Sequence, residues 1–369
     1  MITVAPVRTG AELDEFVAYP SLHLPRDRYV PVWHAAIGRW HQGKGPHTSH
    51  GGVSLVLARD PAGTVVGRST LHDDDRMDAK LGAMTQLMGL TDFTDVDALR
   101  ALVDAAEEAA RAAGRTSVFG PAALLPNQIG GVITSGFEHR GFLDSPWNPP
   151  HYPAAWETLG FERTFPGSTW ICEDLAELDP STIFGAVRDG VDGIELHRGD
   201  RRRLAHQLPL LRRMLNASFL ELPYYTPISA DELAVQTDGL AYLLDESLLL
   251  YVTRDDEPVA FVLVVPDLSE FAMRTGGRLN LVDQLRLLVT RGRYRREAIL
   301  LVKGTVPGAR GLGLMSLLSR ELLTNLKAGG YRSLRVTFIG DDNAGSRAQF
   351  EAMGGRPLHG LTFYRRAVT

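Results

Sequence analysis

The stretch at 298–330, AILLVKGTVPGARGLGLMSLLSRELLTNLKAGG, changes from strand-like to helix-like character within a few residues. Its first part, 298–305, is an apolar run of the length of a buried strand. A proline and glycines at 307–311 then interrupt regular structure. From Leu312 onward, apolar residues recur at spacings of three and four, which predicts a helix that ends at the glycine pair 329–330. A strand that passes through glycines into a helix exposes backbone N–H groups at the positive end of the helix dipole, so we expect an anion-binding loop.

The glycine spacing indicates which anion this loop binds. A phosphate loop of the G-x-x-x-x-G-K-[ST] type is excluded, because no Lys-Ser or Lys-Thr pair follows the glycines. A dinucleotide loop, G-x-G-x-x-G, is disfavoured because only Gly311 and Gly313 have the required spacing. Instead, RGLGLM at 310–315 resembles the pyrophosphate loop R/Q-x-x-G-x-G/A of the GNAT superfamily of acyl-CoA-dependent N-acyltransferases. Met315 departs from that pattern, which prefers a small residue at its last position.

A second motif follows at the spacing that the superfamily has. After a β-rich run at 333–339, the segment NAGSRAQFEAMGG at 343–355 resembles the superfamily's element N-x-x-A-x-x-x-Y-x-x-x-G-F. Phe350 stands where the superfamily usually carries the tyrosine that protonates the departing CoA thiolate, and a phenyl ring has no proton to give. Together the two motifs extend the resemblance over 298–366.

The resemblance implies a binding site for acetyl-CoA or another acyl-CoA, and no metal. Backbone N–H groups at 312–314, with Arg310 nearby, would hold the pyrophosphate, and the backbone at 304–306 would lie beside the pantetheine arm. Asn343 matches the superfamily's contact to that arm. The predicted cofactor-binding residues are therefore Gly304, Thr305, Val306, Arg310, Gly311, Leu312, Gly313, Leu314, Asn343 and Arg347.

The order of predicted elements repeats at about half the chain length. Each half reads as a strand, a helix, a hairpin, a strand, a helix and a strand, with a late helix after them. We therefore predict an α/β (α+β) protein of two tandem GNAT-like domains, each a mixed, mostly antiparallel central sheet flanked by helices. The predicted N-terminal domain spans 1–172, a linker spans 173–192, and the C-terminal domain spans 193–369.

The two halves differ where a cofactor would bind. The helix after the central strand of the first half opens with TDFTD at 91–95 and has no glycine loop. Asp92 and Asp95 would cap this helix well, and their charges would repel a pyrophosphate. We therefore expect CoA in the C-terminal domain and not in the N-terminal one.

The first half carries its own series of motifs, in the order FGP at 119–121, GF at 136–137, WNPPHY at 147–152 and GF at 160–161. This series resembles a group of poorly characterised bacterial tandem acyltransferase-like proteins, which implies an architecture and no particular substrate. Trp147, Asn148 and Tyr152, with Tyr224 from the second half, are the candidate substrate-binding residues. The alternative for each is a residue that shapes a loop or packs between the domains.

Acyl transfer to an amine needs a held thioester, an oxyanion donor, a base for the amine and an acid for the thiolate. The candidates for the base are Glu221, Tyr224, Tyr225 and Asp267. Because position 350 is phenylalanine, the motif supplies no residue that could act as the acid. Tyr225 and Tyr364 are the candidates for this role. The predicted catalytic residues are Tyr225, Glu221 and Tyr364.

Composition and charge narrow the class of protein further. Hydrophobic residues make up 44% and charged residues 22%, as in soluble globular proteins. No apolar run approaches the ~20 residues that span a bilayer, and the first residues lack a signal-peptide pattern. With Cys172 as the only cysteine, we expect a cytoplasmic protein without a membrane partner. The net charge of −5 argues against DNA, and the histidines of 23–50 lack a helical His-x-x-x-His pair, so no metal site is predicted.

The expected acceptor is a small-molecule amine, held in the cleft between the domains of a monomer or homodimer. Two other functions stay open. Arginine runs at 198–213 and 286–296 suit an aminoacyl-tRNA-dependent transferase on a tandem GNAT-like fold, with tRNA as its partner. Met315 and Phe350 suit a catalytically degenerate module for ligand binding or interaction. Neither alternative requires turnover of acyl-CoA.

Overall fold

The structure, a computed structural model, describes residues 1–124, 130–185, 193–238 and 244–368. Its first half alternates strands and helices, as predicted. The elements up to residue 172 are β1 (Thr3–Pro6), α1 (Gly10–His23), α2 (His34–His41), the 3₁₀ helix η1 (Pro46–Ser49), β2 (Val53–Arg59), β3 (Val65–His72), α3 (Asp75–Leu81), β4 (Thr85–Phe93), α4 (Val96–Ala112), β5 (Ser117–Gly120), β6 (Val132–Ile133), α5 (Tyr152–Thr158) and β7 (Glu162–Cys172).

The second half follows a similar order and adds helices on the outside. Its elements are η2 (Leu175–Glu177), α6 (Pro180–Phe184), β8 (Ile194–Arg198), α7 (Leu204–Phe219), α8 (Ala230–Gln236), η3 (Glu246–Leu248), β9 (Leu249–Arg254), β10 (Glu257–Pro266), α10 (Ser269–Thr275), α11 (Leu281–Thr290), η4 (Arg291–Tyr294), β11 (Glu297–Thr305), η5 (Pro307–Ala309), α12 (Leu314–Ala328), β12 (Ser333–Gly340), α13 (Ala344–Ala352) and β13 (Arg356–Ala367).

The described strands form one mixed sheet that runs through both halves. Its order is β1-β2-β3-β4-β5-β13-β7-β12-β11-β10-β9-β8, and β6 pairs with β13 off this path. Most neighbours are antiparallel, whereas β4 with β5 and β11 with β12 are parallel. The predicted α/β class, with a mostly antiparallel sheet flanked by helices, is therefore confirmed.

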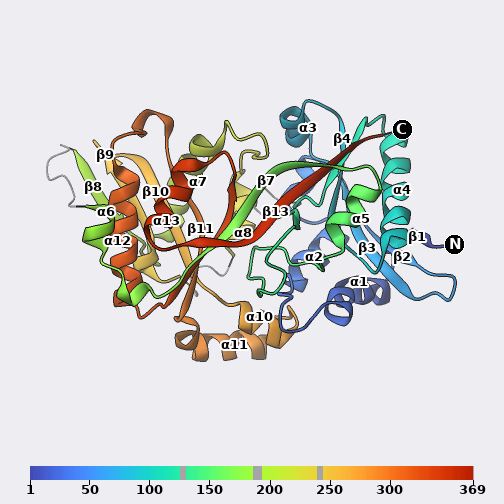
Figure 1. Ribbon diagram of the computed structural model, residues 1–369, viewed down its shortest axis with the longest axis horizontal. Coiled ribbons are helices and arrows are strands. Elements are labelled where there is room, and N and C mark those ends of the chain that lie inside the picture. Colours follow the sequence, from blue (N-terminus) through green and yellow to red (C-terminus); the bar gives the residue numbers. More distant parts are fainter. Residues whose placement is uncertain (125–129, 186–192, 239–243, 369) are drawn as a thin grey trace.

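Each of the two long strands β7 and β13 pairs with a strand of the other half of the chain. The C-terminal strand β13 pairs with β5 of the first half, where Tyr364 lies opposite Gly120. The strand β7, from the end of the first half, pairs with β12 of the second, where Cys172 lies opposite Leu334. Figure 1 shows β7 and β13 crossing the middle of the elongated molecule. The predicted domain limits stay a prediction, and the linker residues 186–192 lie outside the described part of the chain.

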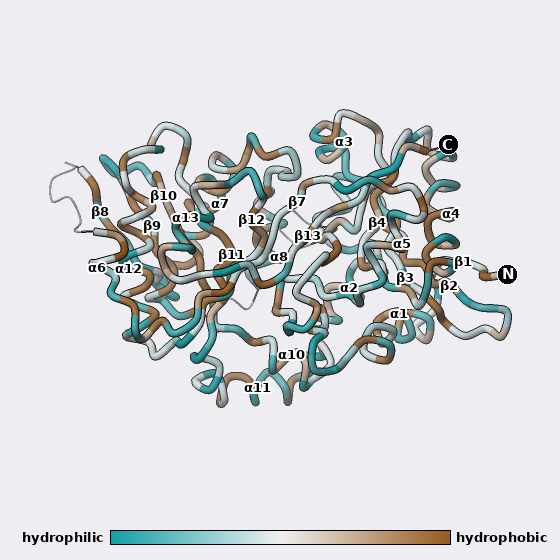
Figure 2. The backbone as a smooth tube through the Cα atoms, in the orientation of Figure 1, coloured by the Kyte–Doolittle hydropathy of each residue, from teal (hydrophilic) through white to brown (hydrophobic). Residues whose placement is uncertain are grey.

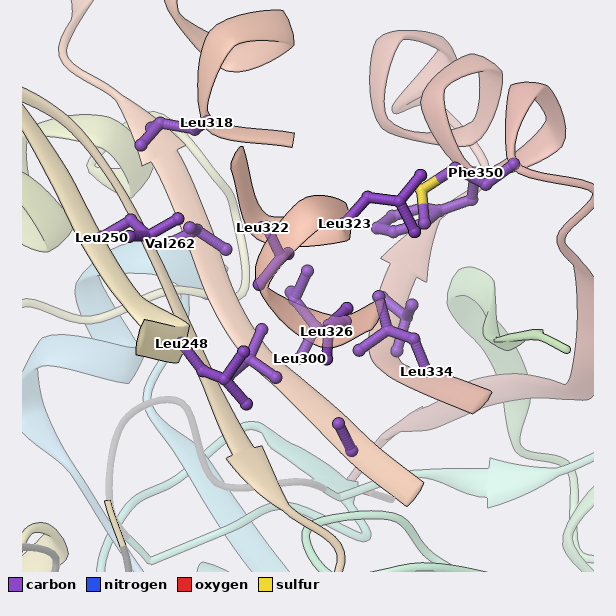
Figure 3. Close-up of a cluster of buried hydrophobic side chains, with 14 of the residues drawn as sticks. Leu248, Leu250, Val262, Leu300, Leu318, Leu322, Leu323, Leu326, Leu334 and Phe350 are labelled. Carbon is purple, nitrogen blue, oxygen red and sulfur yellow. The ribbon is translucent and has the colours of Figure 1, made fainter. Parts of the chain in front are cut away.

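Each half has its own apolar core on the sheet. In the second half, leucines of α12 at spacings of three and four pack onto apolar residues of β9 to β12, as Figure 3 shows for Leu318, Leu322 and Leu326. In the first half, α4 packs in the same way through residues that include Leu99 and Leu102. Figure 2 shows the apolar segments gathered along the sheet and on the inner faces of these helices. The helical periods predicted for both segments are thus confirmed.

The N-terminus of α4 differs in one respect from the sequence-based expectation. Asp95 caps α4 as predicted, since its carboxylate accepts from the N–H groups of Asp97 and Ala98. Asp92 does not cap this helix, because it lies in β4 and forms a buried ion pair with Arg68 at 2.8 Å. After β3, Asp74 caps α3 in the same manner, since its carboxylate accepts from the N–H groups of Arg76 and Met77.

Candidate active site

The strands β11 and β12 are paired over only part of their length. Their parallel register runs from Glu297 opposite Ser333 to Leu300 opposite Val336 and then ends. Beyond this point β11 stays paired with β10, and β12 stays paired with β7, so each keeps its outer partner while the two diverge. Among the described strands, none fills the gap between them. Backbone groups on the inner edges of both strands are therefore available to a ligand.

A β-bulge lies where this gap opens. Leu301 is an extra residue of β11 without a partner on β10, and its carbonyl accepts a hydrogen bond from Thr337 Oγ1 at 3.0 Å. A bulge changes the direction of the side chains that follow it. Beyond the bulge, Val302 packs against the cluster of apolar residues around α7, while Lys303 lies against Phe350 of α13.

The turn between β11 and α12 keeps its glycines in left-handed conformations. Gly311 has a φ of 83° and Gly313 a φ of 74°, and a Cβ at either position would meet no other atom within 4 Å. Gly313 is the N-cap of α12, and no side chain caps this end of the helix. No side chain therefore satisfies the first N–H groups of this helix, although the N–H of Ser316 bonds to Gly313 O at 3.0 Å. Arg310 lies beside them and donates to Ser218 O and Glu221 Oε2, each at 3.3 Å.

A cavity of about 220 Å³ lies between the two halves and includes part of the gap. Both inner strand edges line it, together with the end of α7, the first turns of α13 and residues of the N-terminal half. Most lining side chains are apolar, among them Met77, Leu87, Phe119, Leu124, Phe219, Leu222, Phe338, Phe350 and Phe363. The cavity therefore suits a ligand with a substantial apolar part.

Lys303 brings an amine into this apolar cavity. Its Nζ atom lies 4.2 Å from the centroid of the Phe350 ring and donates a hydrogen bond to Gln349 Oε1. Burial lowers the pKa of Lys303 to about 7. At neutral pH this side chain consequently exists in both its charged and its neutral form.

The other titratable side chains that line the cavity are held differently. The hydroxyl of Tyr225 donates to Asn216 Oδ1 at 2.5 Å. Burial raises the pKa of Tyr224 to about 12, so this phenol stays protonated at neutral pH. Asp74 forms an ion pair with Arg76 at 2.7 Å. The lysine is thus the side chain best placed to exchange a proton in the described part of the cavity.

Comparison with solved structures decides the fold family, whereas no protein-family model matches the chain. A tandem GNAT protein from the clavulanic acid biosynthesis pathway aligns with 100% of this chain and 99% of its own, with a TM-score of 0.58 and 16% identity. The fold is a tandem GNAT fold. A GCN5-related N-acetyltransferase from Sphaerobacter thermophilus aligns with 100% of this chain and 96% of its own, with a TM-score of 0.54 and 12% identity. The predicted resemblance is confirmed at the level of the fold.

Two named bacterial proteins are similar in sequence over nearly the whole chain. Protein YghO of Escherichia coli strain K12 is 25% identical over 365 residues, which cover 97% of this chain and 93% of that protein. A bacterial ceramide synthase of Caulobacter vibrioides is 24% identical over 386 residues, which cover 100% of this chain and 98% of that protein. Both relatives therefore match this chain over nearly its whole length and over nearly the whole of their own.

The tandem GNAT fold gathers the predicted cofactor-binding residues in the C-terminal half. Residues 304–306 lie at the end of β11, and 310–314 form the turn into α12. Asn343 caps α13, with its Oδ1 atom 3.1 Å from the N–H of Ser346, and lines the cavity. Arg347 lies on α13 itself, and Asn343 is the one residue of the predicted cofactor-binding set that lines the described cavity. Binding of CoA by these residues stays a prediction.

The four candidates for the base lie in different places. Tyr224 and Tyr225 line the cavity between the halves of the tandem GNAT fold. Glu221 is exposed beside the glycine turn, where it pairs with the arginine of that turn. Asp267 is buried away from the cavity and forms an ion pair with Arg140 at 3.2 Å. The two tyrosines are therefore the candidates that the fold brings to the cavity.

Tyr364, a candidate for the missing acid, lies outside the cavity. It is fully buried in the N-terminal core, where its ring stacks on Trp156 and its hydroxyl lies 3.1 Å from Glu157 Oε1. Lys303 is absent from the predicted catalytic set. A single lysine inside the apolar run AILLVKGT is the signal that would have identified it.

Three predicted substrate-binding residues shape the N-terminal half and do not line the cavity. Asn148 exchanges two hydrogen bonds with the backbone of Ile133, at 2.7 and 3.2 Å. The hydroxyl of Tyr152 accepts from the N–H of Phe93 at 2.8 Å, and the two rings stack at 3.9 Å. Trp147 is buried in an apolar cluster. The structure therefore gives these residues the packing roles that were the alternative to substrate binding.

Within the described ranges, no group of three or more histidine, cysteine, aspartate or glutamate side chains is placed to hold a metal ion. Of the helices that the structure describes, none has both the length and the apolar content needed to cross a bilayer.

Proposed function

We propose that the protein is an acyl-CoA-dependent N-acyltransferase that binds CoA in its C-terminal half and acylates an amine. One observation carries this proposal. The uncapped N-terminus of α12 and the unpaired inner edge of β11 belong to one continuous segment, which borders the cavity through residues 300–303 of β11. An open helix end beside a free strand edge suits a ligand with a diphosphate and a long arm that contains amide groups.

Different residues of this segment bind different parts of acyl-CoA. The N–H groups at 312–314 bind the diphosphate, with the Arg310 guanidinium beside them. The inner backbone groups at 301–305 hydrogen-bond the pantetheine arm. Bound acyl-CoA supplies the activated acyl group. Backbone N–H groups at the gap orient the thioester carbonyl and stabilise the negative charge that develops on its oxygen.

Lys303 provides the proton that the departing sulfur needs. As the neutral amine attacks, a C–N bond forms, the C–S bond breaks and the thiolate of CoA leaves, while the attacking nitrogen loses one proton to water, which balances the proton that the thiolate receives. The Lys303 ammonium lies over the ring of Phe350, which occupies the position of the usual tyrosine. With a pKa of about 7, this ammonium is a stronger acid than a thiol of pKa ~8.5, so transfer of its proton to the thiolate is favourable.

The acceptor is an amine attached to an aliphatic chain. The lining of the cavity is mostly apolar on both the strand side and the side of the N-terminal half. One relative of matching extent is named a bacterial ceramide synthase, and a ceramide is the amide of a fatty acid with a long-chain amino alcohol. The apolar lining and this name together favour a long-chain amine over a small polar one.

Calorimetric titration of the purified protein with acetyl-CoA, a long-chain acyl-CoA and free CoA tests the cofactor site. Gly313→Glu is the matched variant, because the added carboxylate would stand at the helix N-terminus and repel the diphosphate. The added side chain would meet no neighbouring atom, but the left-handed φ of 74° strains any residue other than glycine, so circular dichroism and the melting temperature check that the variant folds. We expect binding by the wild type, and at least tenfold weaker binding by the variant.

Turnover is then tested with aliphatic amines of increasing chain length, by following the release of free CoA. Equal affinity of Gly313→Glu and the wild type would show that the diphosphate binds elsewhere. No binding of any CoA species by the folded wild type would contradict the proposal, and tRNA binding would be measured next.

A further inference from the structure

The helix α11 exposes an apolar face that no described part of the chain covers. Leu281, Val282, Leu285, Leu288 and Val289 all lie on this ten-residue helix. Their exposed fractions are 77%, 72%, 65%, 39% and 86%. Five of the eleven large apolar side chains that are exposed among the described residues thus gather on one helix. Such a concentration marks an interaction surface rather than scattered surface residues.

The opposite side of α11 is anchored to the protein. Leu287 is buried, with 5% of its surface exposed, and packs in a small cluster with Leu268, Phe271 and Tyr294. Figure 1 shows α10 and α11 on the outer margin of the molecule, below the sheet in this view. The helix is therefore held by one side and presents the other to its surroundings.

Exposed arginines flank and accompany this apolar helix along the chain. The segment 274–296 contains seven of them, Arg274, Arg278, Arg286, Arg291, Arg293, Arg295 and Arg296, and all seven are exposed. Asp283 is the only acidic residue in the same segment. The segment thus carries a net charge of +6, while the whole chain has a net charge of −5. An apolar stripe bordered by arginines is the pattern of a helix that lies in the interface of an anionic membrane.

A second copy of the chain is the main competitor for this surface. Pairing α11 with its own copy would bury the apolar face, but it would also bring two strongly basic segments together. Nucleic acid would suit the arginines and leave the exposed leucines and valines unexplained. The combination of apolar residues and positive charge favours lipid over both.

We propose that the segment 278–296, with α11 at its centre, docks the protein on the surface of an anionic lipid bilayer. The exposed side chains of Leu281, Val282, Leu285 and Val289 enter the boundary between head groups and acyl chains. The arginines bind the lipid phosphates. This surface would bring the protein to the place where amines with aliphatic chains are found, but the docking itself does not depend on the acyltransferase proposal.

Sedimentation with vesicles tests the docking. The full-length protein is mixed with vesicles of phosphatidylcholine alone, or with vesicles that contain about a third phosphatidylglycerol, in the absence of any acyl-CoA. We expect clear binding to the anionic vesicles, several-fold weaker binding to the neutral ones, and a loss of binding in high salt.

Matched variants separate the apolar contribution from general charge effects. Leu285→Gln with Val289→Gln removes apolar side chains and leaves the charge unchanged, and should weaken binding to anionic vesicles at least tenfold. Leu22→Gln changes an exposed leucine of α1, 71% exposed, and should bind like the wild type. Circular dichroism and the melting temperature check that all variants fold.

Three results would overturn the proposal. The wild type could fail to bind anionic vesicles, or the double variant could bind them as well as the wild type. Alternatively, light scattering could show a dimer in the wild type and a monomer in the double variant, in which case the face is an interface between two copies. Failure of CoA binding would leave all these measurements unaffected.

Discussion

Lys303 places a titratable amine beside Phe350, at the position where the GNAT superfamily usually has a phenol. The bulge at Leu301 determines the direction of this lysine, and the surrounding apolar residues lower its pKa to about 7. A residue that costs stability to bury is retained here inside a strand. This cost is understandable if the amine transfers a proton during the reaction.

Replacing Lys303 with methionine should reduce kcat on the order of 10² to 10⁴-fold, because the thiolate would leave without a positioned proton donor. Affinity for acyl-CoA should change little, since the backbone holds the cofactor. Steady-state kinetics with a matched calorimetric titration distinguish the two effects. A kcat within threefold of the wild type would remove Lys303 from the mechanism.

The same substitution should alter the pH dependence of stability. The pKa of Lys303 is about 7 in the folded state and ~10.4 in the unfolded chain. The unfolded state therefore binds more protons between these values, and the penalty for burying the charge fades as the pH rises from 7 to 10. Below pH 7 the penalty is fully present.

Lys303→Met should accordingly melt at a higher temperature than the wild type near pH 7, and this advantage should shrink towards pH 10. Thermal unfolding followed by circular dichroism at pH 6.5 and pH 9.5 measures the difference. An advantage that is equal at both pH values would mean that the lysine is not desolvated.

At the scale of elements, α7 packs directly against β11, next to the gap between β11 and β12. A Cβ atom on Gly304 would lie 2.8 Å from the side chain of Ser218 on α7. The glycine therefore permits the helix to lie directly on the strand. The same helix end supplies the carbonyl that binds Arg310 at the glycine turn.

Gly304→Val should push α7 away from β11 and destabilise the protein by about 1–3 kcal/mol, the usual cost of overpacking. It should also weaken acyl-CoA binding, because the strand edge and the glycine turn would shift together. Chemical unfolding and calorimetric titration provide the two readouts. Gly308→Ala, at a glycine whose Cβ would meet no atom within 4 Å, is the control and should leave both nearly unchanged.

At the scale of the whole molecule, the exchange of β7 and β13 ties the two halves together. The strand β13 completes the sheet of the first half, and β7 extends the sheet of the second. A further link joins the halves where Arg76 of α3 binds Glu232 of α8 at 2.8 Å. The cavity lies across this junction, so its shape depends on both halves.

Differential scanning calorimetry should therefore show one cooperative unfolding transition for the full chain, with equal calorimetric and van't Hoff enthalpies. The physical reason is that neither sheet is complete once the other half has unfolded. Two separate transitions would contradict this expectation and would favour independent domains divided near 173–192.

Local patterns in the sequence determined the strand, the glycine turn and the helix of the cofactor loop, as well as the element order of both halves. These signals depend on residues a few positions apart, so the chain reveals them directly. The pairing of strands that are distant in the sequence leaves no such local signal. Only the tertiary structure showed that β13 belongs to the sheet of the first half, and that Tyr364 is therefore a core residue.

The tertiary structure also decided which side chains reach the cavity and which faces stay uncovered. The bulge in β11 and its divergence from β12 set the position of Lys303, and both depend on pairing with strands that are distant in sequence. The apolar residues of α11 can be read from the sequence, but whether they are exposed depends on which elements pack against them. Strand partners and covering elements come from distant parts of the chain, which is why the sequence alone predicted the fold and the cofactor loop but not the complete site.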